Sequence, residues 1–496
     1  MPNPNLTDVL SIQARRQPSA VAVRLPGKNL GFRQLDALVW RAAALMHGQG
    51  VRAGDVIALT FTSELIVLIA MLATARLGAT VFSVPGSYPQ LQKSEMMARA
   101  RVRFVASDRH DCHRGGLPLL IIDLAVINDP AVRIDVTVRD DQPNAPWLII
   151  AGSGSTGSPK LIPLSHRVFL ERVSLFDKGI PLSSGDCVAT LIHIDFQVAK
   201  IQYLHALLCG ASVSFYSIVR GDVADFCRSN GVSILYTAVI HLEQLIKHVE
   251  GTPVVQPGRA LDFLRALVTG GSTVSDRLRQ RVARHLSERF YVRYGTNETG
   301  PISDASPPGV FTVSGSIGKP YAGVAIDVVD TQGVTVPAGV IGLVRIATPG
   351  VIREYLDDEQ ATKRALQGYW FLPGDLGKLT DDGELIYCGR ADHMMILNGV
   401  NIYPAEIESI ICSHPAVRDA AAMPMRSTLH QDIPVCAVEL FDDVEASETE
   451  LTEYTVARLG FRAPKRIVRV EKIPRTEQGK LIRAEMARLM NAELGL

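Results

Sequence analysis

The sequence predicts an α/β protein with a large N-terminal domain, built of two α/β lobes and a β-rich subdomain, and a small α+β C-terminal domain. Short apolar strands alternate with helical patterns in the first half of the chain. After Gly300 the pattern changes to shorter β-rich segments with Gly/Pro turns, and from Ala391 helices and strands alternate again. A chain of 496 residues is also too long for a single hydrophobic core, which predicts more than one domain.

The first lobe is indicated by apolar strands and amphipathic helices that follow one another closely. Such alternation favours parallel sheets covered by helices on both faces. The same rhythm recurs over residues 187–290, which predicts the second lobe. The apolar run 65–77 is too short to span a bilayer and contains Arg76, so we expect a buried helix. The expected elements of the first lobe are strands at 20–25, 55–60 and 79–84 and helices at 32–47 and 64–77.

The C-terminal part begins after a Gly-Arg-Ala-Asp segment at 389–392, where we place the boundary between domains 1–390 and 391–496. A unit of about a hundred residues is a normal domain size. Upstream of it, segments 315–320 and 339–344 belong to the β-rich subdomain. The expected elements of the C-terminal domain are helices at 404–413 and 450–459 and strands at 435–440 and 466–470.

Charge and cysteine content exclude several classes of function. The 51 basic residues balance 51 acidic ones, which argues against a nucleic-acid or anionic-membrane binder. The seven cysteines form no Cys-x-x-Cys pair, as is typical of a reducing compartment, and residues 1–7 do not resemble a signal peptide. We therefore expect a cytoplasmic protein with no membrane span. The His-Asp-Cys-His run at 110–113 has no second matching cluster, so a metal site there is not favoured.

The most informative segment is Ala-Gly-Ser-Gly-Ser-Thr-Gly-Ser-Pro-Lys at 151–160, which directly follows an apolar strand at 147–150. Glycines let backbone N–H groups approach a ligand closely, and successive N–H groups form an anion-binding concavity. The segment therefore predicts a polyphosphate-binding loop. Its expected donors are the hydroxyls of Ser153, Ser155 and Thr156, the amide of Gly157 and the ammonium of Lys160.

Two other glycine-rich motifs and a linker are disfavoured for this loop. A Walker A loop needs Gly-Lys-Ser/Thr, whereas Ser158 and Pro159 separate Gly157 from Lys160. The loop also has no serine midway between glycines with the spacing of a nucleophile elbow. A flexible linker would not need the closing Pro-Lys pair. Nucleotide binding is the favoured interpretation.

Five further motifs follow the loop in the order known from one superfamily. The chain resembles the adenylate-forming (AMP-binding) enzymes, which comprise acyl- and aryl-CoA synthetases, nonribosomal peptide synthetase adenylation domains and luciferases. The resemblance covers essentially the whole chain, and six motifs in order are far more specific than one. The motifs are Thr-Gly-Gly-Ser at 269–272, Tyr-Gly-Thr-Asn-Glu at 294–298, Gly-Tyr-Trp with Gly-Asp at 368–375, the segment 389–408, and Pro-Arg-Thr-Glu-Gln-Gly-Lys at 474–480.

The resemblance implies that ATP activates a carboxylic acid as an acyl- or aryl-adenylate with release of pyrophosphate. Lys480 would lie between the substrate carboxylate and the α-phosphate, Glu298 would hold Mg²⁺, and Lys160 would hold the departing phosphates. Asp375 would accept hydrogen bonds from the ribose hydroxyls beside Arg390. Tyr294 would stack on adenine. The remaining nucleotide-binding residues that the resemblance implies are Gly270, Gly271, Ser272, Gly295, Thr296 and Asn297.

Three positions depart from the family pattern. Asn297 replaces the usual Thr or Ser beside the α-phosphate, so we expect altered geometry rather than loss of function. Leu161 replaces a common glycine, and Ile396 replaces a frequent lysine just past the hinge. Asp392 matches the hinge residue about which the family's C-terminal domain rotates, so the small domain is expected to be mobile.

The acyl pocket is indicated least clearly. In related enzymes the segment that matches 191–197 presents the residue that meets the acyl group. Asp195 is the first candidate, flanked by His193 and Phe196, and a shift of register would bring Gln197 there instead. Asp195 in a pocket would imply a cationic or hydrogen-bond-donating substrate group, because an unpaired buried carboxylate is costly. The equal alternative is that Asp195 caps the helix that follows.

The acyl acceptor is expected to be a thiol, with coenzyme A as first choice because residues 401–408 look most like those of CoA ligases. A phosphopantetheine on a separate acyl carrier protein is the close alternative, and an amine acceptor giving an amide is a further one. A rival of another class is a non-catalytic nucleotide-binding regulator, since fold does not fix function. A luciferase-like oxygenase is a third interpretation.

Overall fold

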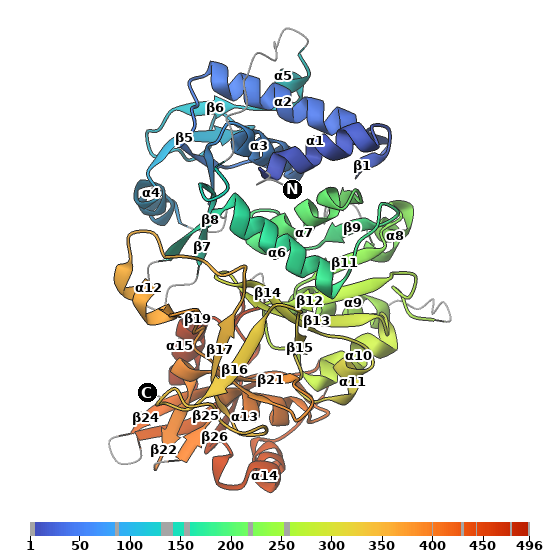
Figure 1. Cartoon of the computed structure of the whole chain (residues 1–496). Coiled ribbons are helices and arrows are strands. Elements are labelled where there is room, and N and C mark those ends of the chain that lie inside the picture. The colour runs from blue at the N-terminus through green and yellow to red at the C-terminus, as the bar shows by residue number, and fades with distance from the viewer. Residues whose placement is uncertain are drawn as a thin grey trace.

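The structure is a computed structural model, and it describes residues 5–84, 89–129, 142–152, 159–216, 222–251, 258–398, 400–427, 431–442, 444–476 and 479–494. The chain runs from the N-terminal lobe at the top of Figure 1 to the C-terminal domain at the bottom. None of the helices in these ranges combines the length and the apolar character needed to cross a membrane.

The N-terminal lobe contains a six-stranded sheet in which the first five strands are parallel. Its central helix, α3 (Glu64–Arg76), is apolar around its whole circumference and is buried from Leu65 onward, as the sequence predicts. Arg76 is buried beside Asp36, at 2.8 Å, and lies over the Trp40 ring. The sheet order is β6 (Leu119–Ile121), β5 (Val102–Ser107), β3 (Val56–Leu59), β4 (Thr80–Ser83), β7 (Pro146–Gly152) and β8 (Lys160–Ser165), and the other helices are α1 (Leu6–Arg16), α2 (Phe32–Gly48), α4 (Gln90–Arg99) and α5 (Leu124–Asn128).

The second lobe contains a nine-stranded sheet, and one of its strands comes from the beginning of the chain. The strand expected at 20–25 does form, but it pairs in parallel with β10 of the second lobe instead of joining the first sheet. The sheet order is β15 (Lys319–Pro320), β14 (Gly300–Ala305), β13 (Phe290–Thr296), β12 (Ala266–Gly270), β11 (Ile234–Thr237), β9 (Cys187–Thr190), β10 (Ser212–Phe215), β1 (Val21–Leu25) and β2 (Lys28–Gly31). Its helices are α6 (His166–Gly179), α7 (Gln197–Leu208), α8 (Val223–Ser229), α9 (Val239–Gly251), α10 (Asp276–His285) and α11 (Gly309–Thr312).

The β-rich subdomain lies between the second lobe and the C-terminal domain (Figure 1). Its antiparallel pair β20–β21 places Asp375 opposite Arg390. The sequence-based segment 315–320 is mostly not a strand, since only the short β15 forms there. The elements are β16 (Ala325–Val329), β17 (Gly342–Ala347), α12 (Glu359–Ala365), β18 (Leu366–Gln367), β19 (Trp370–Phe371), β20 (Asp375–Leu379) and β21 (Leu385–Arg390).

The C-terminal part has its own sheet and its own hydrophobic core, in which Ile407, Ile411 and Val438 are buried. The helices and strands that the sequence predicts there all form. The boundary at 389–392 and the hinge at Asp392 stay predictions. The elements are η2 (Ala391–His393), β22 (Met395–Leu397), β23 (Val400–Ile402), α13 (Pro404–Cys412), β24 (Val417–Ser427), β25 (Gln431–Leu440), α14 (Glu448–Leu459), η3 (Gly460–Arg462), β26 (Arg466–Arg469) and α15 (Arg483–Leu494).

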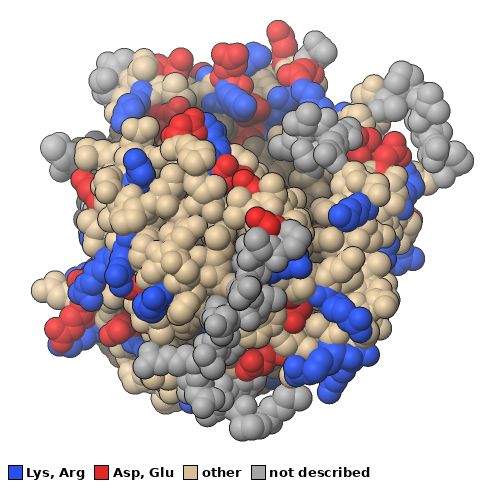
Figure 2. All heavy atoms as spheres, turned by 90° about the horizontal axis from the view of Figure 1, so that it is seen from above, with Lys and Arg blue, Asp and Glu red and all other residues tan. Residues whose placement is uncertain are grey.

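Surface charge is mixed on the face shown in Figure 2. Acidic and basic side chains are interspersed there across the described residues, without a continuous field of one sign. This matches the balanced composition of 51 basic and 51 acidic residues. Such a face offers no broad attraction for a polyanion.

Candidate active site

A buried carboxylate, Asp375, lies where the second lobe meets the β-rich subdomain. The Tyr294 hydroxyl at the end of β13 donates a hydrogen bond of 2.5 Å to its Oδ2, and Arg390 lies 3.4 Å from its Oδ1. Burial raises the pKa of Asp375, while the hydrogen bond from Tyr294 and the charge of Arg390 act in the opposite direction. Arg390 also pairs with Asp392 through contacts of 3.1 Å. The structure therefore brings together four residues from three separate sequence motifs, namely Tyr294, Asp375, and the pair Arg390 and Asp392.

Two glycines, Gly270 in β12 and Gly295 in β13, allow the backbones of neighbouring strands to approach closely next to Tyr294. A Cβ at Gly270 would lie 2.5 Å from the Arg293 carbonyl oxygen, and one at Gly295 would collide with the Gly300 carbonyl oxygen. Larger residues at either position would force the strands apart. Gly271 and Ser272 continue from Gly270 beyond the end of β12, so the 269–272 motif lies beside the C-terminal end of β13, which carries Tyr294 and Thr296.

A second carboxylate, Glu298, lies in the turn between β13 and β14. Its Oε1 accepts a hydrogen bond of 2.9 Å from the Tyr355 hydroxyl. The Lys160 ammonium lies 4.5 Å from the centre of the Tyr355 ring. Tyr355 thus connects the end of the predicted phosphate loop to the predicted magnesium ligand. The sequence motifs do not include Tyr355, and its position became evident only from the fold.

Arg172 on α6 stabilises the turn between β13 and β14 by hydrogen bonds to backbone carbonyl groups. Its guanidinium donates to the carbonyl oxygens of Gly350 at 2.8 Å, Asn297 at 3.0 Å and Glu298 at 2.7 Å. Its burial lowers the pKa of Arg172 to about 9, with the Glu298 charge acting against that shift. The sequence pattern does not reveal this role of Arg172, because an arginine on an amphipathic helix ordinarily faces solvent.

We expect Arg172→Met to destabilise the protein by about 3 kcal/mol, because three buried carbonyl groups lose their donor. The measurement is the midpoint of urea unfolding. Arg167→Met, at an exposed position of the same helix, is the control and should leave the midpoint unchanged. Equal midpoints for the two variants would contradict the supporting role of Arg172.

Lys480 approaches this region from the C-terminal domain. The adjacent Gly479 packs on the N-terminal domain, where a Cβ would lie 3.7 Å from Val239 Cβ and 3.8 Å from Ser272 Oγ. Lys480 is exposed to solvent. Partial desolvation by neighbouring atoms lowers the pKa of its ammonium, while the charges of Glu298 and Asp375 raise it. The charges of Glu298 and Asp375 therefore act on Lys480, whose role in adenylate formation stays a prediction.

The C-terminal domain is held in this position by Arg277 of α10. Its guanidinium donates to the carbonyl oxygens of His414 at 2.7 Å, Val417 at 2.9 Å and Pro415 at 3.0 Å. The same guanidinium lies 4.5 Å from the centre of the Phe441 ring. These contacts cross the interface between the domains and were not predicted from the sequence.

Comparison with known proteins decides the family. Residues 10–356 match the family model of the AMP-binding enzymes, and residues 406–480 match that of the AMP-binding enzyme C-terminal domain. The chain belongs to the AMP-binding enzyme family. This confirms the resemblance read from the ordered motifs.

The relatives of this AMP-binding enzyme include ligases with different acceptors. It is 27% identical to an indoleacetate–CoA ligase from Aromatoleum aromaticum, over 98% of each chain. It is 25% identical to a fatty acid–acyl-carrier-protein ligase from Streptomyces coeruleorubidus, over 97% of this chain and 95% of the relative. An O-succinylbenzoate coenzyme A synthetase from Bacillus subtilis in complex with AMP has the same fold, with a TM-score of 0.86, 22% identity and coverage of 97% and 98%.

The phosphate loop is the part of the predicted site that the structure does not describe. Ser153, Ser155, Thr156 and Gly157 lie outside the described residues. The flanking residues Gly152 and Lys160 are paired across β7 and β8. A Cβ at Gly152 would lie 3.9 Å from the Asn297 side-chain amide nitrogen, so the loop begins beside the motif that carries Glu298.

The segment that was predicted to line the acyl pocket, residues 191–197, leads into α7. His193 Nδ1 and Asp195 Oδ2 are 3.3 Å apart, and this pairing raises the pKa of His193. The alternative that Asp195 caps α7 is wrong, because Phe196 is the N-cap residue and no side chain caps the helix. Gln197 is the first residue of α7. With His193 as its partner, Asp195 does not require a cationic substrate group.

Two charged residues outside the sequence motifs, the buried Lys200 and the partly buried Glu64, support this segment. The ammonium of Lys200 donates to the carbonyl oxygens of Ile194 at 2.5 Å and Asp195 at 2.6 Å. Glu64, at the start of α3, accepts a hydrogen bond of 3.1 Å from the Ile194 amide. Burial lowers the pKa of Lys200 to about 8 and raises that of Glu64 to about 7. Both occur in apolar helices, which is the signal that could have revealed them.

Glu64 makes a pH-dependent contribution to stability. Its folded-state pKa of about 7 lies above the ordinary value of 4.5. Between these two pKa values the folded state keeps the Glu64 proton while the unfolded state loses it. The stability that Glu64 provides at low pH is therefore lost as the pH rises from about 4.5 to about 7. Over that pH interval we expect the free energy of unfolding of Glu64→Gln to rise by about 2 kcal/mol relative to that of the parent protein.

Urea unfolding at pH 5, 6, 7 and 8 measures this difference in the free energy of unfolding. The control is Glu95→Gln at an exposed position, which should follow the parent protein at every pH. A constant difference between Glu64→Gln and the parent protein would contradict the raised pKa.

Proposed function

We propose that the protein activates a carboxylic acid with ATP as an acyl- or aryl-adenylate and then transfers the acyl group to a thiol, with coenzyme A as the first acceptor to test. The supporting observation is that Lys480, from the C-terminal domain, lies within electrostatic reach of Glu298 and Asp375 in the N-terminal domain. A lysine docked against the nucleotide-binding residues suits the joining of two anionic reactants.

In the first step a substrate carboxylate oxygen attacks the α-phosphorus of ATP. The bond from that phosphorus to the bridging oxygen breaks, and pyrophosphate leaves with the bonding electron pair. Lys480 offsets the negative charge of the carboxylate and the α-phosphate, and Lys160 offsets that of the departing pyrophosphate. Asp375 accepts hydrogen bonds from the ribose hydroxyls beside Tyr294 and Arg390.

Glu298 suits a magnesium ion, because Mg²⁺ prefers carboxylate and phosphate oxygens. Tyr355 orients its carboxylate, and Arg172 and the Ile352 amide fix its backbone carbonyl. When bound, the ion would neutralise phosphate charge. Glu298 would hold it at the edge of the predicted phosphate loop.

In the second step the acceptor thiol loses its proton to solvent, and its sulfur attacks the carbonyl carbon of the adenylate. The bond from that carbon to the phosphate oxygen breaks, and AMP leaves. A fatty acid–acyl-carrier-protein ligase is among the relatives, so a carrier-protein phosphopantetheine is the second acceptor to test.

The test of the proposed function is ATP–pyrophosphate exchange across a panel of aryl, aminoaryl, amino and fatty acids. Exchange with one acid class supports acid activation and identifies that class. Thioester formation with coenzyme A, with a pantetheinylated carrier protein or with neither then assigns the acceptor. ATP binding without exchange for any acid would contradict the proposal and favour a nucleotide-binding regulator.

Arg277→Ala is expected to slow adenylation about tenfold, because a weaker interface reduces the population with Lys480 docked. Thioester formation from a supplied acyl-adenylate should not slow, because the domain rotation that the family resemblance implies at Asp392 would break the Arg277 contacts before that step. The measurement is the rate of each half-reaction separately. Arg284→Ala, at an exposed position of the same helix, is the matched control. An equal loss in both half-reactions would contradict the docking role.

A further inference from the structure

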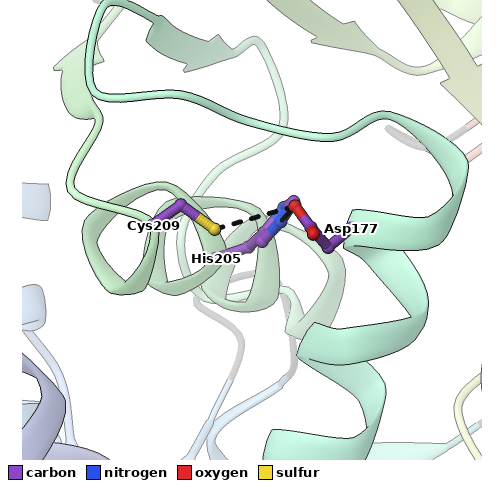
Figure 3. A group of neighbouring side chains, drawn as sticks. All are labelled: Asp177, His205 and Cys209. Carbon is purple, nitrogen blue, oxygen red and sulfur yellow. Dashed lines mark hydrogen bonds and ion pairs between the residues drawn. The ribbon is translucent and has the colours of Figure 1, made fainter.

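Three side chains of different metal-binding types meet at the C-terminal ends of α6 and α7. Figure 3 shows Asp177, His205 and Cys209 directed toward one another. His205 and Cys209 are four residues apart on α7 and so share one face of that helix, and Asp177 comes from the last turn of α6. Within the described ranges this is the one group of three such side chains that converges. The His-Asp-Cys-His run at 110–113 forms no such group, and His113 bonds Ser94.

The separations of the ligand atoms suit a small tetrahedral ion. Asp177 Oδ1 is 3.1 Å from His205 Nε2 and 3.8 Å from Cys209 Sγ, and all three ligand atoms lie within 4.8 Å of one another. Zinc binds sulfur at about 2.3 Å and nitrogen or oxygen at about 2.0 Å, so its tetrahedral ligands lie roughly 3.3 to 3.6 Å apart. An ion could therefore enter with small side-chain movements.

The cluster has one buried ligand, the His205 imidazole, and one solvent-accessible ligand, the Asp177 carboxylate. The His205 side chain is 1% exposed, and that of Asp177 is 47% exposed. The other ring nitrogen of His205, Nδ1, is buried without a hydrogen-bond partner, so the polar contact of this ring in the described structure is with the cluster. Arg293 is the nearby cation, and its charge is offset by two contacts of 2.7 Å to Asp304.

Zinc is bound by a thiolate and a neutral imidazole, so an ion at this site would take the place of the Cys209 thiol proton. The release of that proton makes metal affinity rise with pH.

We propose that Asp177, His205 and Cys209 bind Zn²⁺, with the fourth coordination position taken by water. Sulfur, nitrogen and carboxylate ligands together favour zinc over Mg²⁺ or Ca²⁺, which prefer oxygen alone. The site lies at the opposite end of α7 from the acyl-pocket segment, roughly 18 Å along the helix. Zinc here would join the ends of α6 and α7 and stabilise the helix that follows the acyl pocket.

Titration of the metal-free full-length protein with Zn²⁺ against a competing chelator tests the site. We expect one ion per chain, a rise in the melting temperature, and a thiolate charge-transfer absorption when Co²⁺ replaces Zn²⁺. Cys209→Ser and Asp177→Asn should each lower the Zn²⁺ affinity at least about a hundredfold. Cys112→Ser, which alters the cysteine of the 110–113 run, is the matched control and should bind Zn²⁺ normally.

The absence of Zn²⁺ binding, or equal affinity in Cys209→Ser and the parent protein, would overturn the proposal. Binding that disappears in Cys112→Ser instead would also overturn it. Circular dichroism establishes that each variant is folded. If Cys209→Ser does not fold, Asp177→Asn decides, since that side chain is half exposed and the change preserves its shape. None of these measurements depends on the proposed ligase activity.

Discussion

Lys480→Ala is expected to lower the rate of ATP–pyrophosphate exchange by about two to three orders of magnitude, because the preorganised ammonium between the anionic reactants is lost. ATP binding should remain close to that of the parent protein, since the ribose and phosphate contacts are assigned to other residues. The measurements are exchange with the best acid of the panel and equilibrium binding of ATP.

Two further results define the role of Lys480. Lys472→Ala, an exposed lysine of the same domain, is the control and should exchange at the parent rate. Thioester formation from a supplied acyl-adenylate should be nearly unaffected by Lys480→Ala, because the lysine acts in the first step. Undiminished exchange in Lys480→Ala would refute this role.

Asp375→Ala is expected to raise the KM for ATP by roughly thirtyfold, because charge-assisted hydrogen bonds to the two ribose hydroxyls are lost. The change also leaves the Tyr294 hydroxyl without the acceptor that it contacts at 2.5 Å. We therefore expect a lower urea midpoint as well. The kinetic measurement is exchange as a function of ATP concentration.

A milder variant separates binding from packing at this position. Asp375→Asn preserves the shape of the side chain and an acceptor for Tyr294, so it should fold like the parent protein while its KM for ATP still rises. Asp382→Asn, an exposed aspartate of the neighbouring turn, is the control. An unchanged KM in Asp375→Asn would remove Asp375 from the nucleotide site.

The short motifs indicated the Tyr294, Asp375 and Arg390 cluster better than the sequence indicated the surroundings of residues 193–195. Tyr294, Asp375 and Arg390 occur in short motifs, so their types and order were visible in the sequence, and the structure brings them together. Glu64 and Lys200 come from separate buried helices and meet the 193–195 segment only in three dimensions. Their roles depend on burial, which a single sequence does not display.

The sequence by itself determined the α/β class, the order of the motifs and the family, because strand and helix periodicity and glycine-rich loops are local properties of the chain. Only the tertiary structure decided that β1 joins the second sheet, that Arg172 supports Glu298 and that Arg277 contacts three carbonyl groups of the C-terminal domain. It also brought Asp177 beside His205 and Cys209. The physical reason is that partners distant in sequence are selected by the packing of whole elements, which no local pattern records.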